Sequence, residues 1–389
     1  MKVALVAEWL DPWRGGAETS TQQFIHHLMA AGVELHVFTR SRPAATPSMT
    51  VHTISGASMS RTRRTMTFAH RVERALKAGS FDVTHAISPC RGVDIYEPRG
   101  GTVAESIERN LVLRRAGAAR SIKKCANQIN FKQRYMLGLE RALLGADDGP
   151  LVVAISQYVA RQLRMHYDLP EERIRVIYNG VNVGGGDARE FARDRAAARR
   201  EFGIGDDDLL VILIAHNFRL KGVARWMDAL SLLVRRGITD VRSLVIGKGE
   251  SRFWHRRAQR LGISGFLTFT GPTDRISAFQ HAGDALVHPT YYDPCSRVVL
   301  EGLAAGLPCI TTRWDGASEM IRDGINGYVV DDPEDVPAIA DRIVQLRSPA
   351  QRRSMADAAR ATAIELGMEK HASRMLSLYE ETCSARALI

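Results

Sequence analysis

Two carboxylates and a predicted helix start stand together in one segment, His288–Glu301. The apolar run Ala285–His288 predicts a strand, and the mostly apolar residues from Ser296 onward predict a helix. The first turn of such a helix has backbone N–H groups without partners inside the helix. Together with the helix dipole, these groups attract an anion. The segment around Cys295 and Ser296 is therefore predicted to bind a diphosphate.

The carboxylates of this segment, Asp293 and Glu301, suit the hydroxyl groups of a sugar or a ribose. Glu301 stands among apolar residues, and a carboxylate in such surroundings needs a partner because an isolated buried charge is expensive. A carboxylate that accepts hydrogen bonds from adjacent hydroxyls also fixes the orientation of a ligand. The alternative is that Glu301 merely faces solvent.

Two cations, Arg219 and Lys221, follow the apolar run Leu209–Ala215. Between a strand and a helix they can neutralise the charge that develops on a departing diphosphate. Charges placed in advance at such a position are typically the largest contribution to catalysis. The alternative is a pair of solvated loop residues.

Glycines follow two more predicted strands, Gly15 and Gly16 early in the chain and Gly247 and Gly249 later. Glycine lets a backbone approach a ligand closely, although a simple tight turn also explains such residues. Three histidines lie at or near the ends of predicted strands: His85, His216 and His288. This position is compatible with a role in catalysis or with local packing.

Several common sites are missing from the sequence. No cluster of His, Asp or Glu has metal-ligand spacing, and the five cysteines include no CxxC pair, so neither a metal site nor a disulfide framework is predicted. GxxxxGK[ST] and GxGxxG are absent, which argues against the common nucleoside triphosphate and dinucleotide sites. No apolar run approaches the roughly 20 residues that cross a bilayer, and we expect a reduced cytoplasmic protein.

The 389-residue chain has a formal net charge of +10, and nearly all of the excess lies before Gly180. Basic residues concentrate in Arg61–Lys77 and in Asn110–Gly138, which contains no acid. Such a field attracts the phosphates of an anionic lipid or a phosphorylated glycan, although each stretch also fits a solvated helical face. Nucleic acid is not expected, because aromatic residues are not interleaved with the basic ones.

Short apolar runs alternate with longer amphipathic stretches in both halves of the chain, which is typical of βα units with parallel strands. We therefore predict two doubly wound α/β domains. Three consecutive glycines in Val181–Asp187 predict a hinge between them. The predicted organisation is an N-terminal domain at 1–183, a C-terminal domain at 184–366 and a final helix at 367–389.

Taken together, these segments resemble glycosyltransferase family 4, a family of GT-B enzymes, over almost the whole chain. The most specific motif is an acid, seven residues and then a Glu, which stands here as Asp293 and Glu301, followed by GLAAGLPCI. Further family motifs resemble GGAE at Gly15–Glu18 and RLKGV at Arg219–Val223. The resemblance implies a GT-B fold, in which two Rossmann-like domains face each other across a cleft and C-terminal helices cross back to the first domain.

The resemblance also implies residue roles. Asp293 would contact the donor hexose, Glu301 would hold the ribose, and the amides of Ser296–Val298 would bind phosphate. The residues predicted to act at the reacting centre are Asp293, Arg219 and Lys221. The residues predicted to bind the donor are Gly15, Gly16, Gly247, Cys295, Ser296, Arg297, Val298 and Glu301. No metal and no other cofactor is expected.

Within the family the sequence is most similar to the lipopolysaccharide-core glucosyltransferases, which share the pattern Gly92–Tyr96 and the FxxKGV of Phe218–Val223. This likeness implies transfer of a hexose, with glucose expected, from a UDP-sugar with retention of configuration. The acceptor would be a hydroxyl of a lipopolysaccharide-core, cell-envelope or lipid-linked glycan, and the enzyme would contact the inner face of the cytoplasmic membrane. Two alternatives stay open: a GT-B sugar-nucleotide epimerase, against which the Asp293–Glu301 motif argues, and a non-catalytic binder of anionic lipid.

The sequence departs from the family pattern at several positions. Asp293 replaces the usual Glu, Cys295-Ser296 replaces a Phe-Gly pair, and His216 stands where the diphosphate clamp usually has Arg. Many family members have a polar group of the first domain near the reacting centre, and the corresponding position here is at or near Gly100. Either a neighbour (Arg99 or Thr102) takes a modified role, or that function is missing. These departures affect the prediction of which sugar is bound more than the prediction of the class of reaction.

Overall fold

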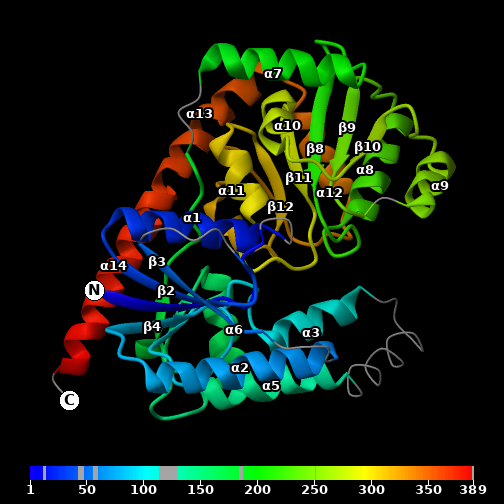
Figure 1. The fold of residues 1–389 in the computed structure, drawn as a ribbon. Coiled ribbons are helices and arrows are strands. Elements are labelled where there is room, and N and C mark those ends of the chain that lie inside the picture. Colours follow the sequence, from blue (N-terminus) through cyan, green and yellow to red (C-terminus); the bar gives the residue numbers. More distant parts are fainter. Residues whose placement is uncertain are drawn as a thin grey trace. The chain divides into compact units, whose positions relative to one another are not determined.

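The computed structural model describes residues 1–11, 15–42, 48–55, 60–113, 130–183, 187–249 and 251–387. The chain divides into two compact units, one formed by Met1–Gly180 with Met368–Ile389 and the other by Val181–Gly367. Each unit is built on a parallel sheet with helices packed against it (Figure 1). The predicted pair of doubly wound α/β domains is confirmed.

The sheet of the first unit has seven parallel strands in the order β3-β2-β1-β4-β5-β6-β7. The order reverses between β1 and β4, and loops at such a reversal form the ligand crevice of doubly wound sheets. The strands are Lys2–Val6 (β1), Glu34–Thr39 (β2), Met49–Thr53 (β3), Val83–Ala86 (β4), Ile95–Tyr96 (β5), Leu151–Ala154 (β6) and Ile174–Val176 (β7). The helices are Gly16–Ala30 (α1), Arg61–Ala78 (α2), Val103–Val112 (α3), Phe131–Leu144 (α5), Gln157–Tyr167 (α6), the short Glu171–Arg173 (η2) and Met368–Ala387 (α14).

The sheet of the second unit has six parallel strands in the order β10-β9-β8-β11-β12-β13, with the reversal between β8 and β11. The strands are Leu209–Ile214 (β8), Val241–Ile246 (β9), Leu267–Gly271 (β10), Ala285–His288 (β11), Cys309–Thr312 (β12) and Gly327–Val330 (β13). The helices are Ala188–Glu201 (α7), Val223–Arg235 (α8), Arg252–Arg260 (α9), Ile276–Ala282 (α10), Arg297–Ala304 (α11), Gly316–Met320 (η3), Val336–Gln345 (α12) and Pro349–Glu365 (α13). Every side chain of β8 is buried, as expected for a strand covered on both faces.

The last helix, α14, belongs to the first unit, as the resemblance implies. It packs against α1, and the hydroxyl of Tyr379 lies 2.7 Å from Nδ1 of His85 at the end of β4. Helix α13 ends at Glu365 and α14 begins at Met368, close to the predicted start of the final helix at residue 367. Of the predicted hinge at Val181–Asp187, residues 184–186 lie outside the described part of the chain.

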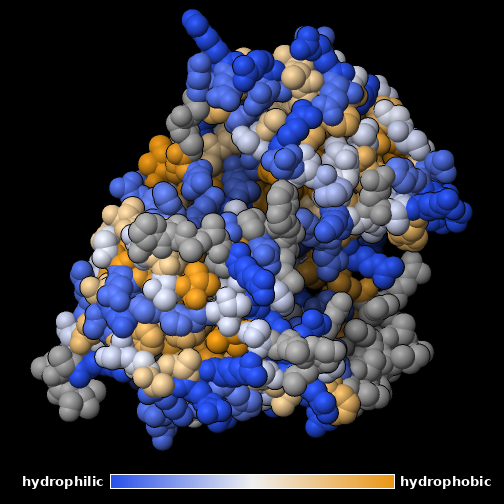
Figure 2. All heavy atoms as spheres, viewed as in Figure 1, coloured by the Kyte–Doolittle hydropathy of each residue, from blue (hydrophilic) through white to orange (hydrophobic). Residues whose placement is uncertain are grey.

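Hydrophilic side chains predominate on the face of the molecule in Figure 2, and apolar ones lie between them in small groups. Among the described residues, no helix combines the length and the apolar character that a membrane span requires.

A buried charge network joins three elements of the first unit. Arg99, which follows β5, lies 2.9 Å from Oε2 of Glu97 and donates to the hydroxyl of Thr21 on α1 at 2.9 Å. Nε2 of His85 lies 3.3 Å from the same Glu97 oxygen, and the Arg99 guanidinium stacks over the ring of Phe24. Burial alone would raise the pKa of Glu97, but the charges of Arg99 and His85 hold it at about 2. The network therefore depends on a permanent buried ion pair.

We expect Arg99→Ala to destabilise the first unit by about 3–5 kcal/mol, because it leaves the Glu97 carboxylate buried without its cation. Urea denaturation of the full chain measures the loss. The matched control is Arg164→Ala, which removes an exposed ion pair with Glu171 and should cost less than about 1 kcal/mol. Equal losses in the two variants would contradict a structural role for the buried pair.

Candidate functional site

The functional residues predicted for the second unit lie mainly in loops at the carboxyl ends of β8 and β11. These two strands are neighbours at the point where the strand order reverses, and β12 lies on the other side of β11. The topology therefore brings Arg219, Lys221 and Asp293 to the ligand-binding edge of one sheet.

Lys221 and Asp293 form an ion pair. The ammonium nitrogen lies 2.5 Å from Oδ2 of Asp293 and also donates to the carbonyl of Tyr292 at 3.2 Å. Nε2 of His288 lies 3.4 Å from the same carboxylate oxygen. Burial alone would raise the pKa of Asp293, but Lys221 and His288 bring it well below its usual range. The predicted sugar-facing carboxylate is thus ionised and is held by one of the two predicted clamp cations.

Gly222 allows the two loops to meet. Its φ is +70°, and a Cβ at this position would lie 1.8 Å from the carbonyl oxygen of Pro289. The loops are also hydrogen-bonded, because the N–H of Tyr291 donates to the carbonyl of Leu220 at 2.9 Å. The glycine after Lys221 is therefore required for Lys221 to reach Asp293.

The first turn of α11 is capped by its own N-cap residue and by a carboxylate from the next loop. The hydroxyl of Ser296 accepts a hydrogen bond from the N–H of Val299, and the N–H of Ser296 donates to Oδ1 of Asp315 at 2.9 Å. The sequence predicts that the Ser296 amide binds phosphate, but in this structure it is bonded to Asp315. Asp315 is not among the residues predicted from the sequence, although an Asp before a Gly-Ala-Ser turn is a common cap.

Glu301 has a partner on its own helix. Its Oε1 accepts from Arg297 at 2.8 Å, and the side chains of Glu301 and Arg297 are 28% and 8% exposed. Among the described residues Oε2 of Glu301 has no hydrogen-bond partner, so one oxygen can still accept from a ligand hydroxyl. Its assignment to the ribose stays a prediction.

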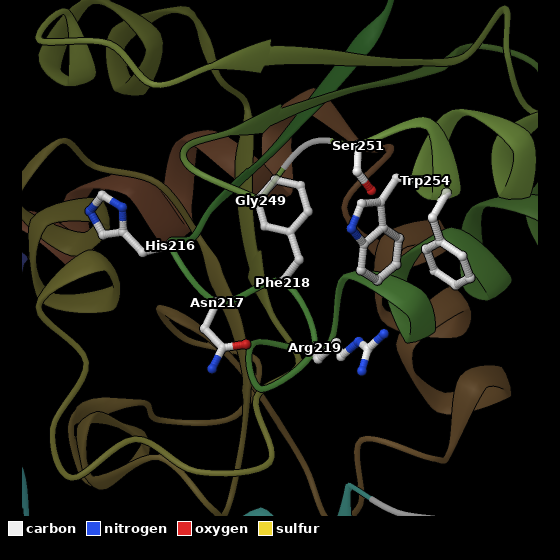
Figure 3. Close-up of a pocket in the computed structure, with 8 residues that line it drawn as sticks. His216, Asn217, Phe218, Arg219, Gly249, Ser251 and Trp254 are labelled. Atoms are coloured by element: carbon white, nitrogen blue, oxygen red, sulfur yellow. The ribbon is translucent and has the colours of Figure 1, made fainter.

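A cavity of about 550 Å³ opens beside the loops that follow β8 and β9 (Figure 3). Gly247 and Gly249 bring these loops together: a Cβ on Gly247 would lie 2.1 Å from the carbonyl oxygen of Ala215, and one on Gly249 would lie 2.4 Å from the Phe218 ring. The lining residues are His216, Asn217, Phe218, Arg219, Gly249, Ser251, Phe253 and Trp254. Of the two predicted clamp cations, Arg219 lines this cavity and Lys221 does not.

In the first unit, Gly15 is the N-cap residue of α1 and contributes no side-chain hydrogen bond to that helix. The N-terminal amides of α1 are therefore compatible with the predicted glycine-loop role of Gly15 and Gly16. His85 is fully buried between Tyr379 and Glu97, as its packing alternative predicts.

The two candidates near Gly100 are both engaged in the fold. Arg99 is buried against Glu97, and Thr102 caps α3 by accepting from the N–H of Glu105. Neither side chain is exposed in this structure.

The two basic stretches of the first unit differ in how much of them the structure describes. Arg61–Lys77 forms most of α2, which buries Phe68 and Val72 and exposes Arg71 and Arg74. In Asn110–Gly138, residues 114–129 lie outside the described residues, and the basic residues of that range are Arg114, Arg115, Arg120, Lys123 and Lys124.

Among the described residues of the first unit, one group has the spacing of metal ligands, namely Glu105, Glu108 and His166. Glu105 already accepts from Arg109 at 2.7 Å and contacts Nε2 of His166 at 2.8 Å. Because these contacts account for the buried carboxylate, the group is explained as a hydrogen-bond network.

Two family models match the chain. One is described as a glycosyl transferase 4-like domain and matches residues 15–180, and the other as glycosyl transferases group 1 and matches residues 209–348. Lipopolysaccharide glucosyltransferase WaaG of Escherichia coli K12 is 22% identical over 320 residues, which cover 82% of each protein. A D-inositol 3-phosphate glycosyltransferase of Acidothermus cellulolyticus is 24% identical and aligns with 99% of this chain and 91% of its own.

Solved structures show the same architecture. The crystal structure of WaaG superposes with a TM-score of 0.81 at 20% identity, covering 97% of this chain and 99% of that one. HepE of Anabaena in complex with UDP-glucose superposes with a TM-score of 0.69 at 18% identity, covering 99% and 100%. Two Rossmann-like domains of this kind define the GT-B class of fold. With both family models matched, the chain belongs to glycosyltransferase family 4 and is a glycosyltransferase.

We expect Gly222→Ala to destabilise the second unit by about 2–5 kcal/mol, from left-handed backbone strain plus a clash with Pro289. The matched control is Gly262→Ala, because Gly262 has the same φ of +70° but no atom within 4 Å of where a Cβ would stand. The control should lose only the backbone strain, about 1–2 kcal/mol. Denaturant midpoints that fall equally in both variants would show that the approach to Pro289 is unimportant.

Proposed function

We propose that the protein transfers a hexose, with glucose expected, from a UDP-sugar to a hydroxyl of a phosphorylated or lipid-linked glycan, with retention of configuration. The observation that carries the proposal is the ion pair between Lys221 and Asp293, which places an ionised carboxylate and an ammonium beside the first turn of α11. Two similar proteins support it, since WaaG is a lipopolysaccharide glucosyltransferase and HepE binds UDP-glucose.

The parts of the donor fit different parts of the second unit. The diphosphate suits the N-terminus of α11 and the Lys221 ammonium, because both attract negative charge. The cavity beside β8 and β9 suits the nucleoside, since its walls carry the aromatic rings of Phe218 and Trp254 and the guanidinium of Arg219. Asp293 then accepts from sugar hydroxyls and Glu301 from ribose hydroxyls.

The reaction breaks the bond between the anomeric carbon and the diphosphate oxygen and forms a bond to the acceptor oxygen on the same face of the sugar. The acceptor proton passes to the departing diphosphate. Lys221 and the α11 amides stabilise the charge that develops on the leaving group, so the proposal assigns this stabilisation to the chain itself without a metal.

The acceptor is proposed to be anionic and to bind the first unit. The excess of basic residues before Gly180 supports this, as does the exposure of Arg71 and Arg74 on α2. The same field suits peripheral contact with an anionic membrane on its cytoplasmic side.

A panel of UDP-, GDP- and ADP-sugars tests the proposed function. With no acceptor, we expect slow release of nucleoside diphosphate from a UDP-hexose, UDP-glucose first, and the same rate in EDTA. Epimerisation of UDP-N-acetylglucosamine alone would establish the epimerase instead. Thermal stabilisation by anionic vesicles, with none from any nucleotide, would indicate the non-catalytic lipid binder.

We expect Lys221→Ala to lower the rate of donor cleavage by roughly 10²–10³-fold, because it removes a cation from the leaving group and from Asp293. Initial rates at saturating UDP-glucose measure the effect. The control is Arg236→Ala, which removes a more exposed ion pair with Asp341 in the same unit and should keep the wild-type rate. An unchanged rate in Lys221→Ala would make this lysine purely structural.

A further inference from the structure

Asp315, in the loop between β12 and η3, is fully buried and strongly hydrogen-bonded. Its Oδ1 accepts from the backbone N–H groups of Ser296 and Ala317, each at 2.9 Å, and its Oδ2 accepts from the hydroxyl of Thr311 at 2.8 Å. All these donors are neutral. In the described part of the chain no basic side chain forms an ion pair with Asp315.

The loop of Asp315 is joined to the loop of Asp293. The N–H of Asp293 donates to the carbonyl of Trp314, and the N–H of Gly316 donates to the carbonyl of Asp293, both at 2.9 Å. The two carboxylates are therefore neighbours, but only Asp293 has an ammonium partner, Lys221. Like charges that share a site disfavour each other's ionisation, so the carboxylate without a cation is the one that gains a proton more readily.

Asp315 also determines which part of α11 meets a ligand. It engages the N–H of Ser296, while the Ser296 hydroxyl engages the N–H of Val299. Between these two amides stand those of Arg297 and Val298, and no acceptor for the Val298 amide is found among the described residues. Under the proposed function a diphosphate docks here, and its negative charge then lies beside the carboxylate that holds the turn.

A proton on Asp315 would relieve the resulting repulsion. Burial raises the pKa of this carboxyl to about 6, and the charge of Asp293 adds to the effect. A further rise of about one pKa unit, equivalent to roughly 1.4 kcal/mol of repulsion, brings it to neutral pH.

We propose that Asp315 is a positioning residue of the donor site, which fixes the first turn of α11 and binds a proton when the diphosphate of a sugar nucleotide docks there. This inference rests on the proposed function. The other titratable side chains on the elements and loops packed around Asp315 are His288, Tyr291, Tyr292, Asp293, Cys295, Arg297, Glu301, Cys309, Arg313 and Glu319. Arg313 is exposed. Asp293 is paired with Lys221, Glu301 is paired with Arg297, and Glu319 is partly exposed. His288 contacts Asp293 and the Ser296 hydroxyl, each at 3.4 Å, and it is unchanged in a variant in which only Asp315 is substituted.

Asp315→Asn tests the proposal in the full-length protein. Asparagine can keep every hydrogen bond, because its oxygen accepts from both amides and its NH₂ group donates to Thr311, whose hydroxyl can accept. UDP-glucose is the probe, since both of its phosphates are esterified and keep a constant charge. Calorimetry from pH 5.5 to 8, in two buffers of different ionisation enthalpy, yields the Kd and the protons exchanged.

For the wild type we expect proton uptake on binding near pH 7 and a Kd that rises about tenfold from pH 5.5 to 8, the equivalent of one pKa unit. The Kd rises with pH because the site binds the diphosphate more tightly when Asp315 is protonated, and Asp315 loses its proton as the pH rises. In Asp315→Asn the Kd should stay constant within about twofold, with no proton uptake. The control Asp341→Asn, an exposed acid of the same unit, should keep the wild-type slope.

The possible outcomes distinguish failure of this inference from failure of the proposed function. A wild-type Kd that does not change with pH, or an equal slope in Asp315→Asn, overturns the inference and leaves the proposed function standing. No binding of UDP-glucose at any pH overturns both. If Asp315→Asn does not fold, Thr311→Val replaces it: loss of the hydroxyl should move the midpoint of the pH dependence upward by about one unit, and an unmoved midpoint counts against the proposal.

Discussion

The ion pair between Lys221 and Asp293 is the interaction on which the geometry of the second unit's site depends. It joins loops that leave neighbouring strands at the reversal of strand order, and a buried carboxylate needs such a partner because an unpaired buried charge is expensive. The close approach of Gly222 to Pro289 makes the pairing sterically possible. The same pairing then decides the electrostatics: Asp293 stays ionised, and the neighbouring Asp315, without a cation, has a raised pKa.

The two cations of the RLKGV motif lie in different surroundings, although they are only two residues apart. Lys221 is directed to Asp293, whereas Arg219, two residues earlier, lines the cavity between the loops after β8 and β9. The amide of Ser296 donates to Asp315, which fixes the first turn of α11. Residues that stand close together in one motif therefore differ in the groups that they contact.

The sequence predicts the fold well because burial on both faces leaves a strong pattern, as in the wholly apolar β8, LLVILI. It gives no indication of β5, which has only two residues and carries no periodic signal. At the site, residue types and strand ends indicate Lys221 and Asp293, which the structure brings together, while the role of Glu301 stays a prediction. Their partners were not predictable, since Lys221 and Asp293 are 72 residues apart and nothing local distinguishes Asp315 from an ordinary helix cap.

In the first unit, the sequence likewise does not predict which partners the side chains near Gly100 have. The position of Arg99 makes it a candidate to replace the polar group that is absent at Gly100. In the structure, however, Arg99 is buried and forms an ion pair with Glu97. Thr102 is likewise used to begin α3. Gly100 itself has no atom within 4 Å of where a Cβ would stand, so packing does not require glycine there. Because Arg99 and Thr102 are both buried, neither is an exposed substitute for the polar group that is absent at Gly100.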